Sequence, residues 1–270
     1  MSKVAIIGIV GESMFMQVDT LPNAGETVHA KEMFCELGGK GFNQAIAVAR
    51  MNESVSFLTA VGSDGYKAKV ETFCQQENIK PFVIEKQGQT AYAVIERDMQ
   101  GENRVTVFAG VTLSEKDIDT FEQEIANAEY LLITNEIPNT VLEKAIKIAY
   151  KYKTKVIFNT APWREIAKDI KEKVWLFTPN QHENIGFEDC KNVIITMGDK
   201  GSYIKQMDIT IPSEKVNAVD TTGAGDTFNG VLTAMLCKGK TIQQAVEIAN
   251  RMAGKSVTKK GVVNAIPYEK

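Results

Sequence analysis

The segment from Asp220 to Gly230 reads DTTGAGDTFNG and lies directly before an apolar run, so it predicts a loop that opens a helix. Gly223, Ala224 and Gly225 allow the backbone to turn its N–H groups toward one point, where the helix dipole adds partial positive charge. This arrangement predicts a site for an anion such as a phosphoryl group. Asp226 would face that anion, a position that suits a carboxylate that takes a proton from an incoming hydroxyl.

A simpler interpretation makes Asp226 an ordinary acid in the first turn of a helix, and makes the glycines a tight turn. Two other phosphate motifs fail. The segment Gly239 to Thr241 ends like a P-loop, but Ala234 stands where its first glycine belongs. The segment Gly8 to Gly11 lacks the third glycine of a dinucleotide fingerprint, so a nicotinamide enzyme is disfavoured.

A second glycine cluster, Gly38 to Gly41, opens the first long predicted helix and again exposes backbone donors at a helix start. Lys40 lies between its glycines, as a catalytic cation or as a side chain directed to solvent. Glu136 follows a predicted strand, where carboxylates accept sugar hydroxyls. Alternatively, Glu136 is an acidic residue in a solvent-exposed loop without a ligand.

The elements that would position these residues alternate between strands and helices. Apolar, β-branched or aromatic runs predict strands at residues 4–9, 56–60, 130–134, 155–159, 175–178 and 193–196. Three- and four-residue apolar spacing predicts helices at 43–51, 114–127, 139–152 and 241–255, with Ser114 and Asn139 as N-caps. This order predicts right-handed βαβ units in a three-layer α/β/α sandwich around a mostly parallel sheet.

Two stretches, at about residues 27–37 and 90–109, break this rhythm. Within the second, residues 91–96 and 104–108 flank a short polar turn and predict a hairpin. We expect both stretches to form a small β-sheet lid that closes over a ligand. An antiparallel edge extension without a gating role is the alternative. Edge strands in such a lid could pair two copies into a homodimer.

The composition is that of one globular domain covering residues 1–270. A formal net charge of −3 gives no global attraction to nucleic acid or to an anionic membrane, so neither partner is expected. The four cysteines form no CxxC pair. No apolar run is long enough for a membrane-spanning helix, and residues 4–9 predict a buried strand, so we expect a cytoplasmic protein.

Together, the two glycine clusters resemble the paired signatures of the ribokinase and phosphofructokinase-B family of sugar kinases. Between them, Thr178 to Glu183 (TPNQHE) is similar to the family's TPNxxE segment, and Thr196 to Gly201 to its nucleotide-side glycine turn. The order and rough spacing hold from Lys3 to Pro267. The resemblance implies a ribokinase-like sandwich with a β lid, and a carbohydrate kinase that uses ATP and Mg²⁺.

The resemblance also implies a role for each matching residue. Asp226 would be the catalytic base, and the N–H groups of Gly223, Ala224 and Gly225 would form the anion hole. The substrate's hydroxyls would be held by Gly39, Lys40, Asn43, Glu136 and Asp226. The nucleotide would be bound by Asn180, Thr196, Gly198, Gly201, Asn250 and Gly261, with Glu183 holding Mg²⁺ indirectly.

A monovalent cation such as K⁺ is a further implication of the resemblance. Its ligands would come from Asp220, Thr222, Ser256, Lys259 and Gly261, mostly through backbone carbonyls. Ala265 offers no side-chain oxygen where some relatives have a hydroxyl. Asn52 replaces a signature glycine after the first helix, and asparagine tolerates the left-handed conformation that a helix end requires.

The phosphate acceptor stays open at this stage. Gly11 and Ser13 stand where ribokinase would present an Asn and an Asp, so the pocket is predicted to be less polar. A modified sugar, a sugar phosphate and a nucleoside such as pseudouridine are the alternatives, the last with a base stacked on Phe15, Phe34 or Phe108. The short segment after Glu183 also allows a non-catalytic regulator that binds small molecules on the same fold.

Overall fold

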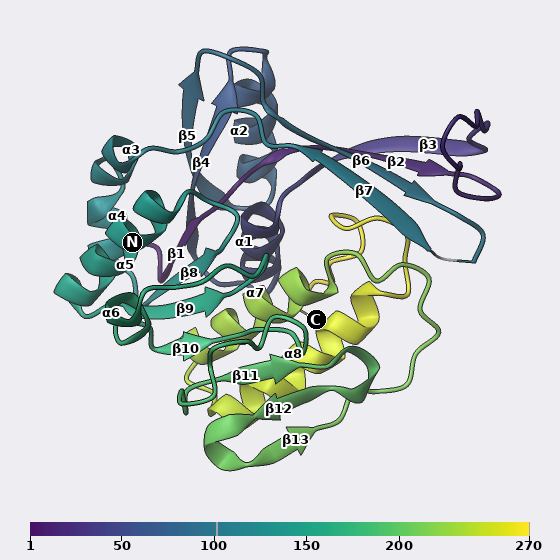
Figure 1. Cartoon of the computed structure of the whole chain (residues 1–270). Coiled ribbons are helices and arrows are strands. Elements are labelled where there is room, and N and C mark those ends of the chain that lie inside the picture. Colours follow the sequence, from purple (N-terminus) through teal and green to yellow (C-terminus); the bar gives the residue numbers. More distant parts are fainter. Residues whose placement is uncertain (101, 270) are drawn as a thin grey trace.

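A six-stranded parallel sheet forms the centre of the computed structural model, which describes residues 1–100 and 102–269 (Figure 1). In spatial order the strands are β10 (Leu176–Phe177), β9 (Lys155–Asn159), β8 (Tyr130–Thr134), β1 (Val4–Ile7), β4 (Val55–Gly62) and β5 (Ile79–Lys86). All five neighbouring pairs are parallel. β1 and β8 are buried along their whole length and rich in Ile, Leu and Val, as a sheet covered on both faces requires.

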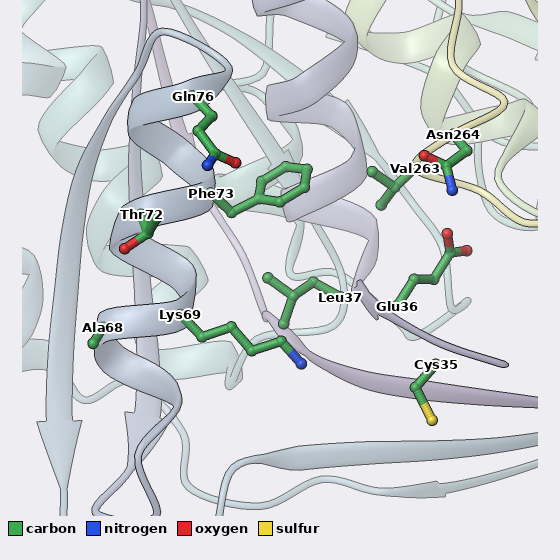
Figure 2. A pocket seen from close by; sticks show the side chains of 10 residues that line it. All are labelled: Cys35, Glu36, Leu37, Ala68, Lys69, Thr72, Phe73, Gln76, Val263 and Asn264. Atoms are coloured by element: carbon green, nitrogen blue, oxygen red, sulfur yellow. The ribbon is translucent and has the colours of Figure 1, made fainter.

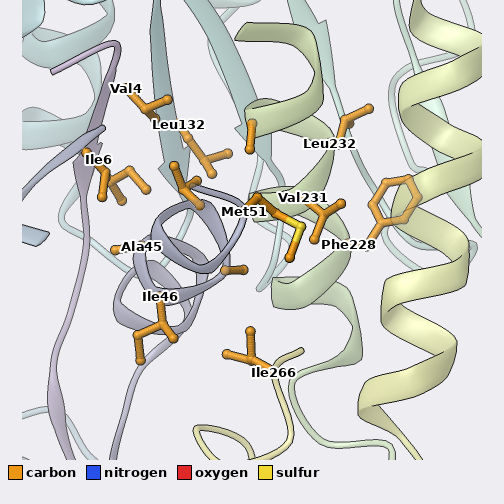
Figure 3. Close-up of a cluster of buried hydrophobic side chains, with 14 of the residues drawn as sticks. Val4, Ile6, Ala45, Ile46, Met51, Leu132, Phe228, Val231, Leu232 and Ile266 are labelled. Carbon is orange, nitrogen blue, oxygen red and sulfur yellow. The ribbon is translucent and has the colours of Figure 1, made fainter. Parts of the chain in front are cut away.

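Helices cover both faces of this sheet. One face carries α1 (Lys40–Arg50), α2 (Tyr66–Gln76), α7 (Ala224–Cys237) and α8 (Ile242–Ser256). The other carries α3 (Glu115–Asp119), α4 (Glu122–Asn127), α5 (Asn139–Tyr152) and α6 (Lys168–Lys171). Figure 3 shows the first core, where Ile46 of α1, Val231 of α7 and Leu132 of β8 lie together. The predicted three-layer sandwich is confirmed.

A four-stranded lid projects from one side of the sandwich (Figure 1). Its strands, in order, are β3 (Glu32–Gly38), β2 (Gly11–Gln17), β6 (Ala91–Arg97) and β7 (Asn103–Phe108). The β6–β7 hairpin agrees with the prediction for residues 90–109. The first predicted lid segment, residues 27–37, is corrected to 32–38, because residues 27–31 precede the ladder that pairs β3 with β2.

A third, small sheet lies beside the sandwich and is antiparallel. It contains β11 (Ile194–Thr196), β12 (Ser202–Ile204) and β13 (Ile209–Ile211). Two isolated parallel bridges, Phe177 to Val193 and Asn180 to Thr196, connect it to the end of β10. Residues 193–196 were predicted as a strand of the main sheet. They form instead the first strand of this small sheet.

The predicted helix ends agree with the structure at some positions and differ at others. Ser114 caps α3 with a capping box, as predicted, but the helix expected over residues 114–127 is divided into α3 and α4. Asn139 is the first residue of α5, and Pro138 takes the N-cap position. Asn52 adopts a positive φ of 54° after α1, as expected for a replaced glycine. In the described part of the chain, no helix has the length and apolar character needed to cross a membrane.

Candidate active site

The predicted site residues meet where the strands of the main sheet end. Glu136 follows β8, Asn159 ends β9, and Thr178 follows β10. The starts of α1 and α7 lie in the same region, because Lys40 of α1 bonds Glu136 and Gln44 of α1 bonds Asp226 of α7. Each helix follows a glycine with positive φ, Gly39 at 117° and Gly223 at 74°. Carboxyl ends of parallel strands together with helix N-termini form the usual ligand site of this architecture.

Asp226 lies in the first turn of α7 and is buried. Its two carboxylate oxygens accept hydrogen bonds from α1: Asn43 Nδ2 donates to Oδ2 at 2.9 Å, and Gln44 Nε2 donates to Oδ1 at 3.2 Å. These bonds fix the direction of the carboxylate. Burial raises the pKa of Asp226, and the charge of Lys40 and the two amide bonds oppose this rise. A carboxylate with a raised pKa is better suited to accept a proton near neutral pH.

The loop before Asp226 leaves backbone donors free. The N–H of Ala224 donates to the carbonyl oxygen of Thr221 at 3.3 Å. Within the described residues, the N–H groups of Gly223 and Gly225 have no protein acceptor. A side chain at Gly223 would collide with Val262, whereas the space beside Gly225 is open. Two of the three predicted anion-hole donors are therefore available at the positive end of α7.

Lys40 and Glu136, both half-buried, complete a cluster of charges around Asp226. The backbone N–H of Lys40 donates to Glu136 Oε2 at 2.9 Å. Asp226, then Glu136 and Glu183, raise the pKa of the Lys40 ammonium against the effect of burial. Burial raises the pKa of Glu136 to about 7, with a further rise from Asp226 and an opposing effect of Lys40.

Arg164 holds the loop that carries Glu136. Its guanidinium donates to the carbonyl oxygens of Asn135 and Ile137 and to Asn135 Oδ1. Asn135 also donates through its side-chain amide to the carbonyl oxygen of Pro162 at 2.9 Å. The loop is thus fixed on both sides of Glu136, and the direction of that carboxylate is set by the fold.

The TPNQHE segment turns tightly beside the cluster. Asn180 Oδ1 accepts the N–H groups of His182 and Glu183, at 2.8 and 2.9 Å, and Glu183 Oε2 lies 3.3 Å from the N–H of Asn180. The N–H of Thr196 donates to the carbonyl oxygen of Pro179 at 3.0 Å, which joins this turn to β11. Thr178, the first residue of this segment, donates through Oγ1 to Asn229 of α7, so the segment is joined to the helix that carries Asp226.

The remaining predicted nucleotide residues lie around the small sheet and the last loop. Gly198 and Gly201 have positive φ and flank a short turn between β11 and β12. Asn250 of α8 is buried; its side chain accepts from Ser202 Oγ at 2.7 Å and donates to the carbonyl oxygen of Ile211 at 3.0 Å. Its amide therefore joins α8 to the small sheet. A contact between Asn250 and a nucleotide would use the remaining hydrogen-bonding capacity of this amide.

The predicted cation loop is assembled around Asp220. Its carboxylate accepts the N–H groups of Thr222, at 3.0 Å, and Gly261, at 3.2 Å. In the part of the chain that the structure describes, the carbonyl oxygens of Thr222, Lys259 and Gly261 accept no hydrogen bond. A carboxylate with free carbonyls nearby is a donor set that suits a monovalent cation. Ser256 Oγ donates to the carbonyl oxygen of Ala253 at 2.8 Å, and the carbonyl oxygen of Ser256 accepts the N–H of Lys259 at 3.3 Å, so both oxygens of this residue already have protein partners.

The Asp226 cluster lies apart from the cavity beside α2. Among the described residues, no group of three or more His, Cys, Asp or Glu side chains could hold a metal ion. A cavity of about 560 Å³ lies between α2, the end of β3 and the C-terminal loop (Figure 2). It is lined by Glu36, Lys69 and Phe73 among others, and by none of the predicted site residues. We therefore place the site at the Asp226 cluster.

Sequence reasoning missed several polar residues that support Asp226. Gln44 is fully buried and connects Asp226 to Asn159 Oδ1, at 3.3 Å. Asn159 in turn donates to the carbonyl oxygen of Thr178 at 2.9 Å, and Thr178 Oγ1 donates to Asn229 Oδ1 at 2.5 Å. The signal for Gln44 was its place next to Asn43 in the GGKGFNQ run. For Asn159 it was a polar residue at the end of an apolar strand.

Comparison with known proteins supplies the family. The model of the pfkB family of carbohydrate kinases matches residues 1–269. A ribokinase from Haemophilus influenzae is 31% identical over 288 residues, which cover 97% of this chain and 94% of the relative.

Solved structures agree with this match. The crystal structure of ribokinase from Thermotoga maritima superposes with a TM-score of 0.89 and 31% identity, over 99% of this chain and 97% of that one. Ribokinase from Cryptococcus neoformans var. grubii serotype A in complex with ADP superposes with a TM-score of 0.84 and 26% identity, with 99% and 97% coverage. On the family match and the fold together, this chain belongs to the pfkB family of carbohydrate kinases.

Proposed function

We propose that this carbohydrate kinase transfers the γ-phosphoryl group of ATP to a hydroxyl of a sugar or sugar-like small molecule, with Asp226 as general base. The observation that carries the proposal is the buried carboxylate of Asp226, oriented by Asn43 and Gln44 beside free N–H groups at the start of α7. A base and an anion hole at one point are what phosphoryl transfer to an alcohol requires.

In the proposed reaction, the acceptor hydroxyl gives its proton to Asp226. The oxygen forms a bond to the γ-phosphorus while the bond from that phosphorus to the bridging oxygen breaks, and ADP leaves. The N–H groups of Gly223 and Gly225 and the dipole of α7 stabilise the negative charge on the transferred group. Ala224 contributes if its long bond to Thr221 opens. The Lys40 ammonium faces the same charge.

Unpaired buried atoms support a polyhydroxyl acceptor. Asn43 Oδ1 and Gln44 Oε1 are buried and have no hydrogen-bond partner within the described residues. Such atoms are destabilising unless a ligand supplies donors, and sugar hydroxyls are donors. The proposed acceptor site thus consists of Gly39, Lys40, Asn43, Glu136 and Asp226. The carboxylate of Glu136 accepts hydroxyl protons on the side opposite the base.

The nucleotide and ions occupy the other side of Asp226 in this proposal. Asn180, Thr196, Gly198, Gly201, Asn250 and Gly261 border the nucleotide. Glu183 would hold Mg²⁺ indirectly, and the ion would supply positive charge that offsets the charge of the phosphates. A monovalent cation such as K⁺ would take its ligands from the free carbonyls around Asp220, with Ser256 and Lys259. The ADP complex of the Cryptococcus relative supports an adenine nucleotide as donor.

A nucleoside is the second candidate acceptor, because one face of the lid presents aromatic and aliphatic side chains. Phe15, Phe34 and Ile95 lie on one face of the lid and line a small cavity with Asp220. Phe15 and Phe34 stack on each other, with centroids 4.7 Å apart, so one ring at most presents its other face to a base. Strand alternation places Phe108 on the opposite face of the lid, which removes it from this role.

The decisive experiment measures ADP release from ATP and Mg²⁺ with a panel of pentoses, hexoses, their phosphates and nucleosides. We expect one acceptor class to give turnover, and Asp226→Asn to lower kcat by ~10² to 10⁴ while ATP still binds, as measured by calorimetry. Asp169→Asn, at an exposed acid of α6, is the matched control and should behave as wild type. Undiminished turnover by Asp226→Asn would overturn the role of the base.

The proposal also includes the setting of the enzyme. We take residues 1–270 as one catalytic domain that works in the cytoplasm, where its nucleotide donor is abundant, with a small-molecule substrate and without nucleic acid or membrane as partners. We further propose a homodimer formed through the lid strands, since the outer lid strands β3 and β7 carry exposed apolar side chains.

A further inference from the structure

Arg97 connects the lid to the loop that precedes the anion hole. It is the last residue of β6, an inner strand of the lid. Its guanidinium donates to the carbonyl oxygen of Val219, and its Nη1 lies 3.8 Å from Asp220 Oδ2. The contact therefore joins segments that are 122 residues apart in sequence.

The partner of Arg97 is a carboxylate that needs a positive charge. The side chain of Asp220 is only 9% exposed, and its two bonds to backbone N–H groups leave its net charge in place. Asp220 lies three residues before Gly223, where the negative phosphoryl group would bind. An uncompensated carboxylate at this point would repel that group and displace the loop that presents the N–H donors.

A second acid increases the negative charge in this region. Glu36 of β3 accepts the N–H of Val262 at 2.6 Å, beside the Gly261 that donates to Asp220. Its Oε2 is buried and has no partner among the described residues. Burial, with a smaller effect of Asp220, raises the pKa of Glu36. Lys260 pairs with Glu32 instead, so in the part of the chain described, Arg97 is the only basic side chain that pairs with Asp220.

We infer that Arg97 is a positioning residue that supplies the countercharge of Asp220, so that the anion hole is ordered when the lid is closed and without a bound alkali cation. The inference rests on the proposed kinase function. It deepens that function by assigning to a lid side chain the positive charge that Asp220 needs. A K⁺ ion held by the free carbonyls of Thr222, Lys259 and Gly261 would otherwise supply that charge. The lid thereby couples closure over the acceptor to the shape of the phosphoryl site.

The test compares wild type with Arg97→Ala and Arg97→Lys, each in KCl and in tetramethylammonium chloride of equal ionic strength. Arg104→Ala is the matched control, because Arg104 is a lid arginine that bonds the carbonyl oxygen of Pro22 and, among the described residues, no carboxylate. Two quantities are measured in each salt: the rate of ADP release and the midpoint of thermal unfolding. The second reports on the loop even in the absence of turnover.

We expect the rate and the midpoint of wild type and Arg104→Ala to be the same in both salts. Arg97→Ala should lose up to about 10²-fold in rate without potassium, the size expected when a catalytic loop is misplaced by about 1 Å, and KCl should restore most of it. Its unfolding midpoint should rise in KCl. Arg97→Lys should retain more activity than Arg97→Ala, because it keeps the charge without the planar fork.

Three results would overturn the inference: a wild type that needs potassium as strongly as Arg97→Ala, an Arg97→Ala enzyme that is fully active without potassium, or a loss that potassium does not restore. Failure of the proposed function is separate. If no acceptor gives turnover, the potassium-dependent shift of the unfolding midpoint in Arg97→Ala, absent from wild type, still supports the inference, and its absence rejects it.

Discussion

Glu136 is the residue whose ionisation connects stability with binding. Its carboxyl group is mostly removed from water between Lys40 and Asp226, and burial raises its pKa to about 7. In the unfolded chain it would lose its proton near pH 4.5. Between these values the folded protein holds more protons than the unfolded chain, so stability falls as the pH rises through this range and stays lower above pH 7.

Glu136→Gln should remove this dependence, because the amide does not ionise and can still accept the N–H of Lys40. We expect the variant to gain stability over wild type above pH 7, by at most ~3 kcal/mol, and to gain little at pH 4.5. Acceptor affinity should fall at the same time, since a carboxylate accepts hydroxyl protons more strongly. Denaturant unfolding at pH 5 and pH 8 measures the first effect, and an equal gain at both values would contradict it.

At the residue scale, the sequence predicted the charged centre better than its support. Asp226, Asn43, Lys40 and Glu136 lie in motifs with a recognisable chemical purpose, and the structure brings them together. Arg164 was not predicted, because it lies in an irregular loop and its purpose is to bond backbone carbonyls on either side of Glu136. Contacts of this kind depend on tertiary structure and leave no pattern in the local sequence.

The contact between α1 and α7 is the element-scale feature on which the site depends. Gly230 of α7 allows it: a Cβ there would lie 2.5 Å from Ala47 Cβ and 2.6 Å from the carbonyl oxygen of Gln44. The missing side chain therefore brings the helix that carries Asp226 within hydrogen-bonding distance of the helix that carries Asn43 and Gln44. Close packing of backbone determines the geometry of the base.

Gly230→Ala should push these two helices apart. We expect a loss of about 1 to 3 kcal/mol in stability, the usual effect of overpacking a core, together with a lower kcat because Asp226 loses its orientation. The matched control is Gly254→Ala in α8, where the new Cβ meets no atom within 4 Å. That variant should gain up to about 1 kcal/mol from helix propensity and keep kcat. Thermal unfolding and initial rates decide; a Gly230→Ala enzyme with wild-type values would refute the packing argument.

Elements with one clear burial pattern were predicted, and elements with mixed patterns were missed. β5 contains Pro81 and polar residues because it is an edge strand of the main sheet, where a ladder donor can be lost. α2 buries only Val70 and Cys74, one narrow stripe. β2 follows β1 after three residues and crosses into the lid, so its residues appeared to be a pocket loop.

At the scale of the whole molecule, the lid is attached to the sandwich at several points. Glu12 at the base of β2 accepts from Tyr66 and pairs with Lys69 of α2. Glu36 and Arg97 reach the segments around Gly261 and Asp220. The base of the lid is thus held by α2, while β3 and β6 contact the loops of the proposed phosphoryl site. Motion of the lid would change the electrostatics of that site as well as access to it.

The outer edge of the lid leads to the last prediction. All six residues of β7 are exposed, and Val107, at 67% exposure, is among several apolar side chains on this strand. An exposed edge strand with apolar side chains pairs readily with another chain unless a partner covers it. We therefore expect light scattering to give about twice the mass of one chain for wild type.

Val107→Lys should shift the enzyme toward the monomer at equal concentration, because the introduced ammonium would have to be desolvated in the interface. Tyr150→Lys, at an equally exposed aromatic residue of α5, should leave the mass unchanged. A monomeric wild type would remove the proposed dimer altogether. A Val107→Lys dimer as stable as that of wild type would place the dimer contact away from the lid edge, the unpaired strand on which the proposed association depends.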